Sequence, residues 1–165
     1  MPPAPVNAGG NKGGTAEVGA GDGTIYDDDT QNGWAPWGWA KECTYSNTSP
    51  VRTGTKSIAV KLGGYEALYL HHTEFDTSAF SMLTFYVQST SEQEATIKVV
   101  GLHKDKASGP TFELPPLPPG AWTKVTVPLA KIGLDNSVDV TGIFLQNGSD
   151  KPVSTLYLDD IRLQR

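Results

Sequence analysis

Apolar and polar residues alternate along much of the chain after residue 23. In the stretch 83–88, LTFYVQ, the alternation puts Leu, Phe and Val on one side and Thr, Tyr and Gln on the other. A side-chain period of two is typical of a β-strand with one buried face. Related runs occupy residues 57–62, 67–71, 95–102, 123–128, 142–146 and 155–163. Residues 129–134 favour a short helical turn instead.

Segments rich in Gly, Pro, Asn and Ser separate these runs and are typical of tight turns. The pattern therefore predicts an all-β domain of about eight or nine short strands, folded as a two-sheet antiparallel β-sandwich or a barrel. Strands of this kind bury one face and leave the other in water. The wet faces are where a binding site is expected.

Residues 1–22 are Pro-rich and then Gly-rich, with hardly an apolar side chain. Such a segment cannot bury enough surface to offset its ordering entropy, so we predict a flexible linker followed by one domain over residues 23–165. A linker at one end is typical of a domain taken from a larger modular protein, with its partner domain upstream. The alternative is a disordered tail with no neighbour.

The chain of 165 residues carries a formal net charge of −5. This balance argues against nucleic acid as a partner, because Lys and Arg must replace the counterions of phosphates. No apolar run is long enough to cross a bilayer, and residues 2–22 show no signal peptide, so no membrane partner is expected. Cys43 is the single cysteine, which excludes an intrachain disulfide. A monomer is the default for a tethered domain.

Four local patterns resemble one family. Tyr26-Asp27 leads through a turn to Gly33-Trp34, and the phrases GTKSIAV (54–60), LPPGAWTKVTVPLAKI (117–132) and LYLDDIRL (156–163) follow in order. Residues 24–165 thus resemble the β-jelly-roll carbohydrate-binding modules of the galactose-binding-domain-like type, which are attached to bacterial polysaccharide-degrading enzymes. The resemblance implies a jelly roll, a secreted or cell-surface location, and polysaccharide as the partner.

Jelly rolls of this type often hold a structural calcium where the first and last strands meet. The resemblance places Asp27 and Asp159 there, with Asp28 and Asp160 as the residues that a one-residue slip would bring in. Backbone carbonyls of the 52–56 turn would add oxygen ligands. A carboxylate between apolar strand residues needs a cation or hydrogen-bond partners. The alternative is that Asp159 or Asp160 pairs with Arg52, Lys56 or Arg162, or faces water.

A sugar site combines aromatic platforms, which stack on the CH faces of the rings, with planar polar side chains that bind hydroxyls. Candidates for carbohydrate binding on the wet faces and in the Pro/Gly loop are Trp37, Trp39, Tyr65, Tyr69, His71, Tyr86, Gln88 and Gln146. If their strands are neighbours in one sheet, the strand residues form one aromatic and polar patch. Alternatively, the tyrosines serve only for cross-strand packing.

Several aromatic residues have competing interpretations. Trp34 and Trp122 resemble structural positions of the jelly-roll family, so we assign both to packing. Trp37 is the first choice for ligand contact, and either it or Trp39 could lie in the core. His71 and His72 face opposite sides of a strand and cannot chelate one ion well, so a polar contact is expected for His71.

No motif indicates an enzyme, because the chain has no GxSxG, HExxH or P-loop and its Glu residues are scattered. We therefore expect a noncatalytic module that targets an attached enzyme to plant-type polysaccharide, either β-glucan or hemicellulose, through a concave sheet face. The alternative is a noncatalytic β-sandwich for protein interaction or surface assembly, with an apolar patch in place of the wet one. A small catalytic jelly roll would need a cleft with paired carboxylates.

Overall fold

The structure is a computed structural model that describes residues 20–92 and 96–165. Most of the predicted linker, residues 1–19, lies outside these ranges. The elements are β1 (Thr24–Tyr26), β2 (Ala35–Pro36), β3 (Glu42–Asn47), β4 (Ser57–Lys61), β5 (Ala67–Phe75), β6 (Met82–Ser89), β7 (Ile97–His103), β8 (Lys106–Glu113), β9 (Thr123–Pro128), a 3-10 helix η3 (Leu129–Ile132), β10 (Val140–Asn147) and β11 (Leu156–Gln164).

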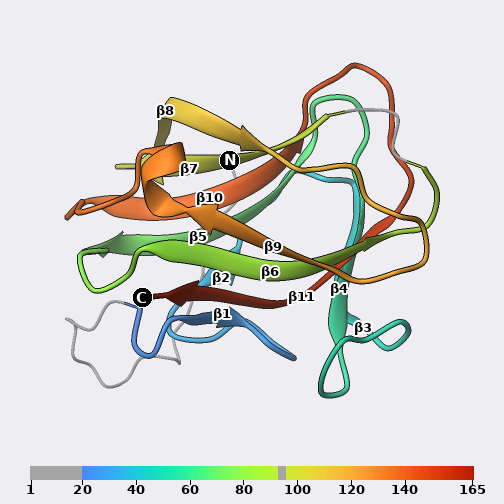
Figure 1. Cartoon of the computed structure of the whole chain (residues 1–165), viewed down its shortest axis with the longest axis horizontal. Helices are drawn as coiled ribbons and strands as arrows, with labels where there is room; N and C mark the ends of the chain where they lie inside the picture. Colours follow the sequence, from blue (N-terminus) through green and yellow to red (C-terminus); the bar gives the residue numbers. More distant parts are fainter. Residues whose placement is uncertain (1–19, 93–95) are drawn as a thin grey trace.

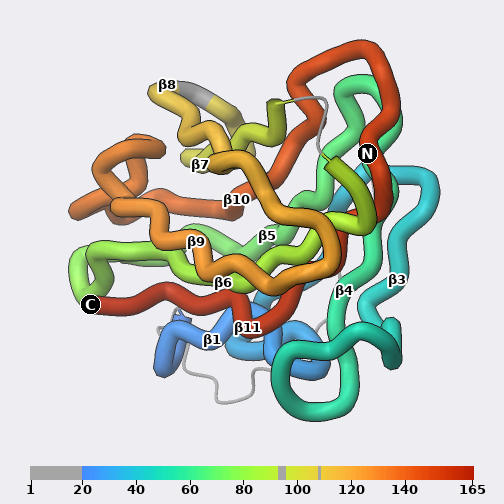
Figure 2. Tube along the Cα trace, turned by 45° about the vertical axis from the view of Figure 1, so that its right-hand side comes forward, coloured from blue at the N-terminus to red at the C-terminus, as the bar shows by residue number. Residues whose placement is uncertain are grey.

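The strands form two antiparallel sheets. Sheet A has the order β3-β4-β11-β6-β9, with β1 paired to the second half of β11, and sheet B has the order β2-β5-β10-β7-β8. Figure 1 shows the strands of both sheets, and in Figure 2 the neighbours β9, β6 and β11 run side by side. The sequence-based prediction of an all-β, two-sheet sandwich is confirmed.

Alternation along the strands builds the core between the sheets. In β6 the apolar side chains of Leu83, Phe85 and Val87 are buried, and in β5 Leu68 and Leu70 meet them from the other sheet. Each of these side chains has lost nearly all contact with water, and burying one large apolar side chain contributes about 1.5–3 kcal/mol to the free energy of unfolding. The residues between them point outward and define the outer face of each sheet.

A β-bulge in β11 breaks this alternation. Leu158 and Ile161 both point into the core although two residues separate them, so the register with β6 shifts between Asp159 and Arg162. Asp160 takes a left-handed backbone conformation (φ 53°) to accommodate the extra residue. The bulge lies where β1 begins to pair with β11, and it positions the two neighbouring carboxylates.

Three edge strands were not predicted, and the first of them, β2, has only two residues. β3 is mostly exposed along its length, so its sequence ECTYSN carries no apolar alternation. β8 contains Gly109-Pro110, which the sequence reading took as a turn, whereas an edge strand tolerates proline. The predicted helical turn is confirmed as η3. Within the described ranges, no helix has the length and apolar character needed to span a membrane.

Candidate functional site

The outer face of sheet B carries most of the aromatic candidates. Residues directly opposite each other in an antiparallel sheet point to the same side. Three rows cross β5, β10 and β7 on this face: Ala67–Gln146–Lys98, Tyr69–Phe144–Val100 and His71–Gly142–Leu102. The loop after β2 runs along the free edge of β5, because the backbone N–H groups of Trp37 and Trp39 donate to the carbonyls of Tyr69 and Ala67. Both indoles therefore join the face.

Trp37 forms the buried part of this aromatic group. Its ring stacks flat on His71 with 3.5 Å between ring centroids and meets Tyr69 edge-on. Only 9% of Trp37 is exposed, and burial raises the pKa of Tyr69 to about 12. The indole Nε1 of Trp37 is buried without an acceptor among the described residues. Trp37 is thus a buried packing partner of Tyr69 and His71, and Trp39 is the tryptophan of this loop that is exposed to solvent.

Trp39 and Tyr65 form the exposed part. Trp39 is 46% exposed and Tyr65 55%, which makes them the two most exposed aromatic side chains of the described chain. Trp39 packs edge-on against Tyr69 and Phe144, and its Nε1 donates to the Tyr65 carbonyl at 3.1 Å. Gln146 donates to the same carbonyl at 2.9 Å. The Tyr65 carbonyl therefore holds the side chains of Trp39 and Gln146 next to Tyr65 on one surface.

The turn that presents Tyr65 is held on both sides. Tyr65 adopts φ 59°, a left-handed conformation that is uncommon for an aromatic residue. Its N–H donates to Ser149, while the neighbouring Glu66 accepts hydrogen bonds from the Gly63 and Lys41 N–H groups. Strain of this kind persists only where surrounding contacts fix it, and it concentrates at functional sites.

His71 is fixed in the stack by a carboxylate. Its Nε2 lies 3.1 Å from Asp105 Oδ1, and its ring stacks on Trp37. Burial lowers the pKa of His71, and Asp105 opposes that shift in part. His72 faces the other way, into the core beside Trp34 and Phe75. The expectation that the two histidines face opposite sides is confirmed.

Tyr86 and Gln88 lie elsewhere. Their strand, β6, belongs to sheet A, so it is not a neighbour of β5 or β10. The single patch that would have united them with Tyr69, His71 and Gln146 does not form. Tyr86 instead lies beneath the guanidinium of Arg52, whose Cζ is 4.2 Å from the ring centroid. The sequence reading missed Phe144 as a member of the aromatic group on sheet B, although its alternation with Gln146 placed it on this face.

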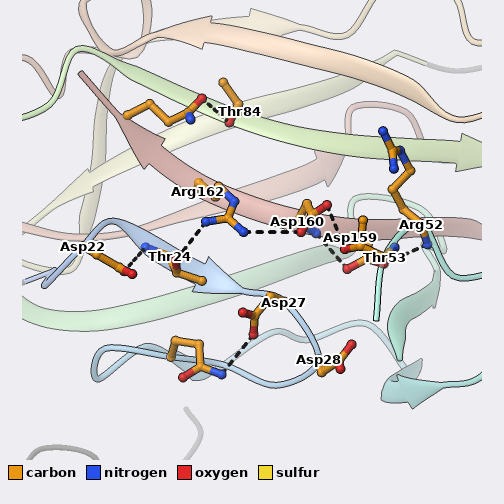
Figure 3. A network of polar contacts seen from close by, with 12 residues as sticks. Asp22, Thr24, Asp27, Asp28, Arg52, Thr53, Thr84, Asp159, Asp160 and Arg162 are labelled. Atoms are coloured by element: carbon orange, nitrogen blue, oxygen red, sulfur yellow. Dashed lines mark hydrogen bonds and ion pairs between the residues drawn. The ribbon is translucent and has the colours of Figure 1, made fainter. Parts of the chain in front are cut away.

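The four Asp residues of the predicted metal site lie near the bulge of β11 (Figure 3), and N–H and O–H groups occupy their oxygens. Asp159 is fully buried and accepts the backbone N–H groups of Arg52, Thr53 and Asp160. Desolvation raises the pKa of Asp159, and these three donors oppose the rise.

The other three carboxylates have separate partners. Asp28 accepts the N–H groups of Thr55 and Lys56, which lower its pKa. Asp27 accepts from the Gln31 side chain at 3.0 Å. Asp160 accepts from the Thr53 hydroxyl and lies 3.6 Å from Arg162. The alternative pairing of Asp160 with Arg162 is therefore present.

The hydrogen bonds of these four carboxylates leave few oxygen lone pairs for a calcium ion. The 52–56 turn directs N–H groups at the carboxylates of Asp28 and Asp159. Calcium needs six to eight oxygen ligands, and a carboxylate already bound to several N–H groups has few lone pairs to offer. Within residues 20–92 and 96–165, no three His, Cys, Asp or Glu side chains gather in a metal-binding group. Calcium binding by these four residues stays a prediction that needs a direct measurement.

The two tryptophans assigned to packing differ in their surroundings. Trp34 is 4% exposed and packs edge-on against Phe75 with 5.5 Å between ring centroids, so its assignment is confirmed. Trp122 is partly exposed and is absent from the described residues that pack in or against either apolar cluster. Trp122 therefore lies outside both clusters, and its assignment to packing stays a prediction.

The fold is that of the jelly-roll carbohydrate-binding modules. A family 11 module from a cellulosomal cellulase of Clostridium thermocellum superimposes with a TM-score of 0.62 at 11% identity, over 86% of this chain and 92% of that one. The same family 11 module in complex with a β-1,3-1,4-mixed-linked tetrasaccharide gives 0.59 at 11% identity, over 86% and 94%. A mutant family 29 module in complex with mannohexaose gives 0.53 at 16% identity, over 84% and 87%.

The chain belongs to the family of expansin-like protein C-terminal domains, whose model matches residues 25–165. No match was found among curated protein sequences. At identities this low, the structural likeness establishes the fold alone.

Proposed function

We propose that this domain is a noncatalytic carbohydrate-binding module that holds chains of plant-type polysaccharide, β-glucan or hemicellulose, on the outer face of sheet B. One observation carries the proposal: Trp39 and Tyr65 are both exposed, and the side chains of Trp39 and Gln146 both donate to the Tyr65 carbonyl. Two exposed aromatic platforms with an amide beside them match the CH faces and hydroxyls of a sugar chain.

The buried aromatic residues preorganise this surface. Tyr69 and Phe144 pack edge-on against Trp39, and Trp37 packs edge-on against Tyr69, so Trp39 loses little freedom when a sugar binds. The fixed left-handed turn does the same for Tyr65. The similarity to family 11 and family 29 modules, described as bound to a mixed-linked tetrasaccharide and to mannohexaose, supports a glycan as the partner.

The proposal includes the larger protein to which the domain is attached. A module that only binds raises the local concentration of an attached catalytic domain on its polysaccharide, and the Gly- and Pro-rich segment of residues 1–22 suits such a tether. A catalytic domain upstream of this segment, a monomeric module and a secreted or cell-surface location complete the proposal.

Native gels that contain one soluble polysaccharide each test this function. The panel is β-glucan, xyloglucan, xylan, glucomannan and galactan, run with wild type, Trp39→Ala, Tyr65→Ala and the control Val138→Ala. Val138 is 73% exposed and is not part of the aromatic group. We expect one or more polymers to retard wild type and the control, and each aromatic variant to lose about tenfold or more in affinity. If folded wild type migrates unretarded in every gel, the protein-interaction alternative takes its place.

A further inference from the structure

The outer face of sheet A carries a second set of aromatic and amide side chains. Tyr157 of β11 lies directly between Ala59 of β4 and Gln88 of β6. One row along, Tyr86 lies between Asp159 of β11 and Lys124 of β9. The neighbours of these residues along each strand fill the core, so the rows face outward. None of these residues belongs to the aromatic group on sheet B.

Trp122 extends the first row. Val125 and Val127 are buried in the core, so alternation places Lys124 and, two residues earlier, Trp122 on the outer side. Continuing the register Val87↔Thr123 by one residue sets Trp122 opposite Gln88. The N–H of Gly120 donates to the Ser89 carbonyl at 2.8 Å, which holds this segment against the end of β6.

Tyr157, Gln88 and Trp122 therefore occupy three adjacent strands, β11, β6 and β9. Two strand spacings separate the two aromatic residues, roughly 10 Å. This separation suits stacking on two pyranose rings of one chain, with the amide of Gln88 between them to bind hydroxyls. Trp122, Tyr157 and Tyr86 are all partly exposed.

A polar pocket lies at the end of this row. It has a volume of about 400 Å³ and is lined by Lys61, Thr90 and residues 152–155. Lys61 ends β4 next to the pairing of Val60 with Leu156, and the N–H of Thr90 donates to the Thr155 carbonyl. The pocket thus opens where β4, β11 and β6 end, beside Tyr157. Its hydroxyl groups and one ammonium group can bind the polar edge of a sugar.

The charges on this face are mostly positive although the chain is acidic. Arg52, Lys61 and Lys124 have no carboxylate at ion-pair distance among the described residues. The Arg52 guanidinium extends toward β6 in Figure 3 and stacks on Tyr86. Asp159 below it is fully buried, and Glu42, opposite Lys61 on the edge strand, offsets one of the three positive charges.

We propose that the outer face of sheet A is a second glycan-binding surface, and that it takes a chain bearing uronic acid carboxylates. Trp122 and Tyr157 stack on the sugar rings, Gln88 binds hydroxyls, and Arg52, Lys61 and Lys124 attract the carboxylates. The surface lies on the sheet opposite to Trp39 and Tyr65, so one domain could hold two different polysaccharides of a composite wall together.

Affinity gels with polygalacturonate and with its carboxyl-reduced, neutral product test the proposal. The proteins are wild type, Trp122→Ala, Gln88→Ala and Trp39→Ala, each checked for folding by its thermal transition. We expect polygalacturonate to retard wild type and Trp39→Ala equally, and Trp122→Ala to bind about tenfold more weakly. Gln88→Ala removes a partly exposed amide, so it keeps the test valid if Trp122→Ala does not fold.

Three results would overturn the proposal. Folded wild type that is not retarded by polygalacturonate would show no such site. Equal retardation by the reduced polymer would show that the carboxylates are not recognised. Retardation lost in Trp39→Ala but kept in Trp122→Ala and Gln88→Ala would place acidic chains on sheet B. None of these results depends on whether a neutral polysaccharide binds to Trp39 and Tyr65, so the two proposals fail separately.

Discussion

Replacement of Asp159 by Ala removes the single acceptor of three backbone N–H groups. Arg52 and Thr53 donate to Oδ2 at 2.9 and 3.2 Å, and Asp160 donates to Oδ1 at 2.8 Å. The carboxylate ties the 52–56 turn to the bulge of β11, and it is fully buried. Water therefore cannot simply replace it in the folded state.

The cost can be worked out from these three bonds. Each of these partly buried N–H groups, when left without an acceptor, costs about 1 kcal/mol at the low end of the usual range, so Asp159→Ala should lower the free energy of unfolding by about 3 kcal/mol. We use the low end of the range because burying the Asp159 carboxylate itself costs free energy, as its raised pKa indicates. The variant no longer has this unfavourable contribution, which offsets part of the loss of the three hydrogen bonds. For a domain of this size the melting temperature should fall by about 6–12 °C.

Urea and thermal unfolding of wild type, Asp159→Ala and the control Asp27→Ala, each in excess EDTA and in calcium, check this reasoning. Asp27 is partly exposed and receives one hydrogen bond from Gln31, so little change is expected in that variant. We expect the loss in Asp159→Ala to be the same in both buffers. A wild type that EDTA destabilises as much as the substitution does, or a matching loss in Asp27→Ala, would refute the N–H account and establish a calcium site.

Two further outcomes are expected. His103 contacts Asp139 through Nδ1 and the Gly133 carbonyl through Nε2, both at 2.7 Å, and the bond to Asp139 raises the pKa of His103. The stabilisation from protonated His103 should be complete below about pH 6.5 and should be lost as the pH rises through the raised pKa of His103 in the folded state. The stability difference between wild type and His103→Gln, followed by urea unfolding, should shrink on going from pH 6 to about pH 8.5. A difference that grows with pH would contradict this sign. In Gly142→Ala the new Cβ would lie 2.7 Å from the Leu70 carbonyl and from the Tyr69 ring, so a loss of about 1–3 kcal/mol in unfolding free energy and weaker glycan binding are expected. An unchanged melting temperature would show that sheet B can shift to make room.

The sequence predicts the strands that bury one face, and it fails where neither face is buried. LTFYVQ in β6 and TKVTVP in β9 alternate because one side of each meets the core. β3 and β8 lie at the edges of the two sheets, where few side chains are buried and the alternation that marks a strand is missing. The positions of edge strands depend on pairing with a neighbour, which a local pattern does not contain.

The aromatic group on sheet B was predicted only in part. A local sequence pattern gives the side to which a residue points, but it does not give the order of the strands in the sheets. Tyr69, His71 and Gln146 were correctly placed on one face, but Tyr86 was assigned to it from alternation alone, which gives the side and not the sheet. Trp37 was preferred over Trp39 for ligand contact, whereas Trp37 is stacked on His71 and buried, and Trp39 is exposed. That choice depends on tertiary contacts made thirty residues along the chain.

Chemical-shift mapping with a soluble β-glucan oligosaccharide tests the central claim most directly. In the ¹⁵N-labelled domain, we expect saturable shifts of the Trp39 indole N–H and of the backbone amides of Tyr65, Tyr69 and Gln146, because the sugar rings would lie on that surface. The strands β6 and β11 of sheet A should remain unshifted with a neutral oligosaccharide. Shifts confined to sheet A, or none at saturating oligosaccharide from any member of the β-glucan and hemicellulose panel, would contradict the assignment of the glycan to sheet B.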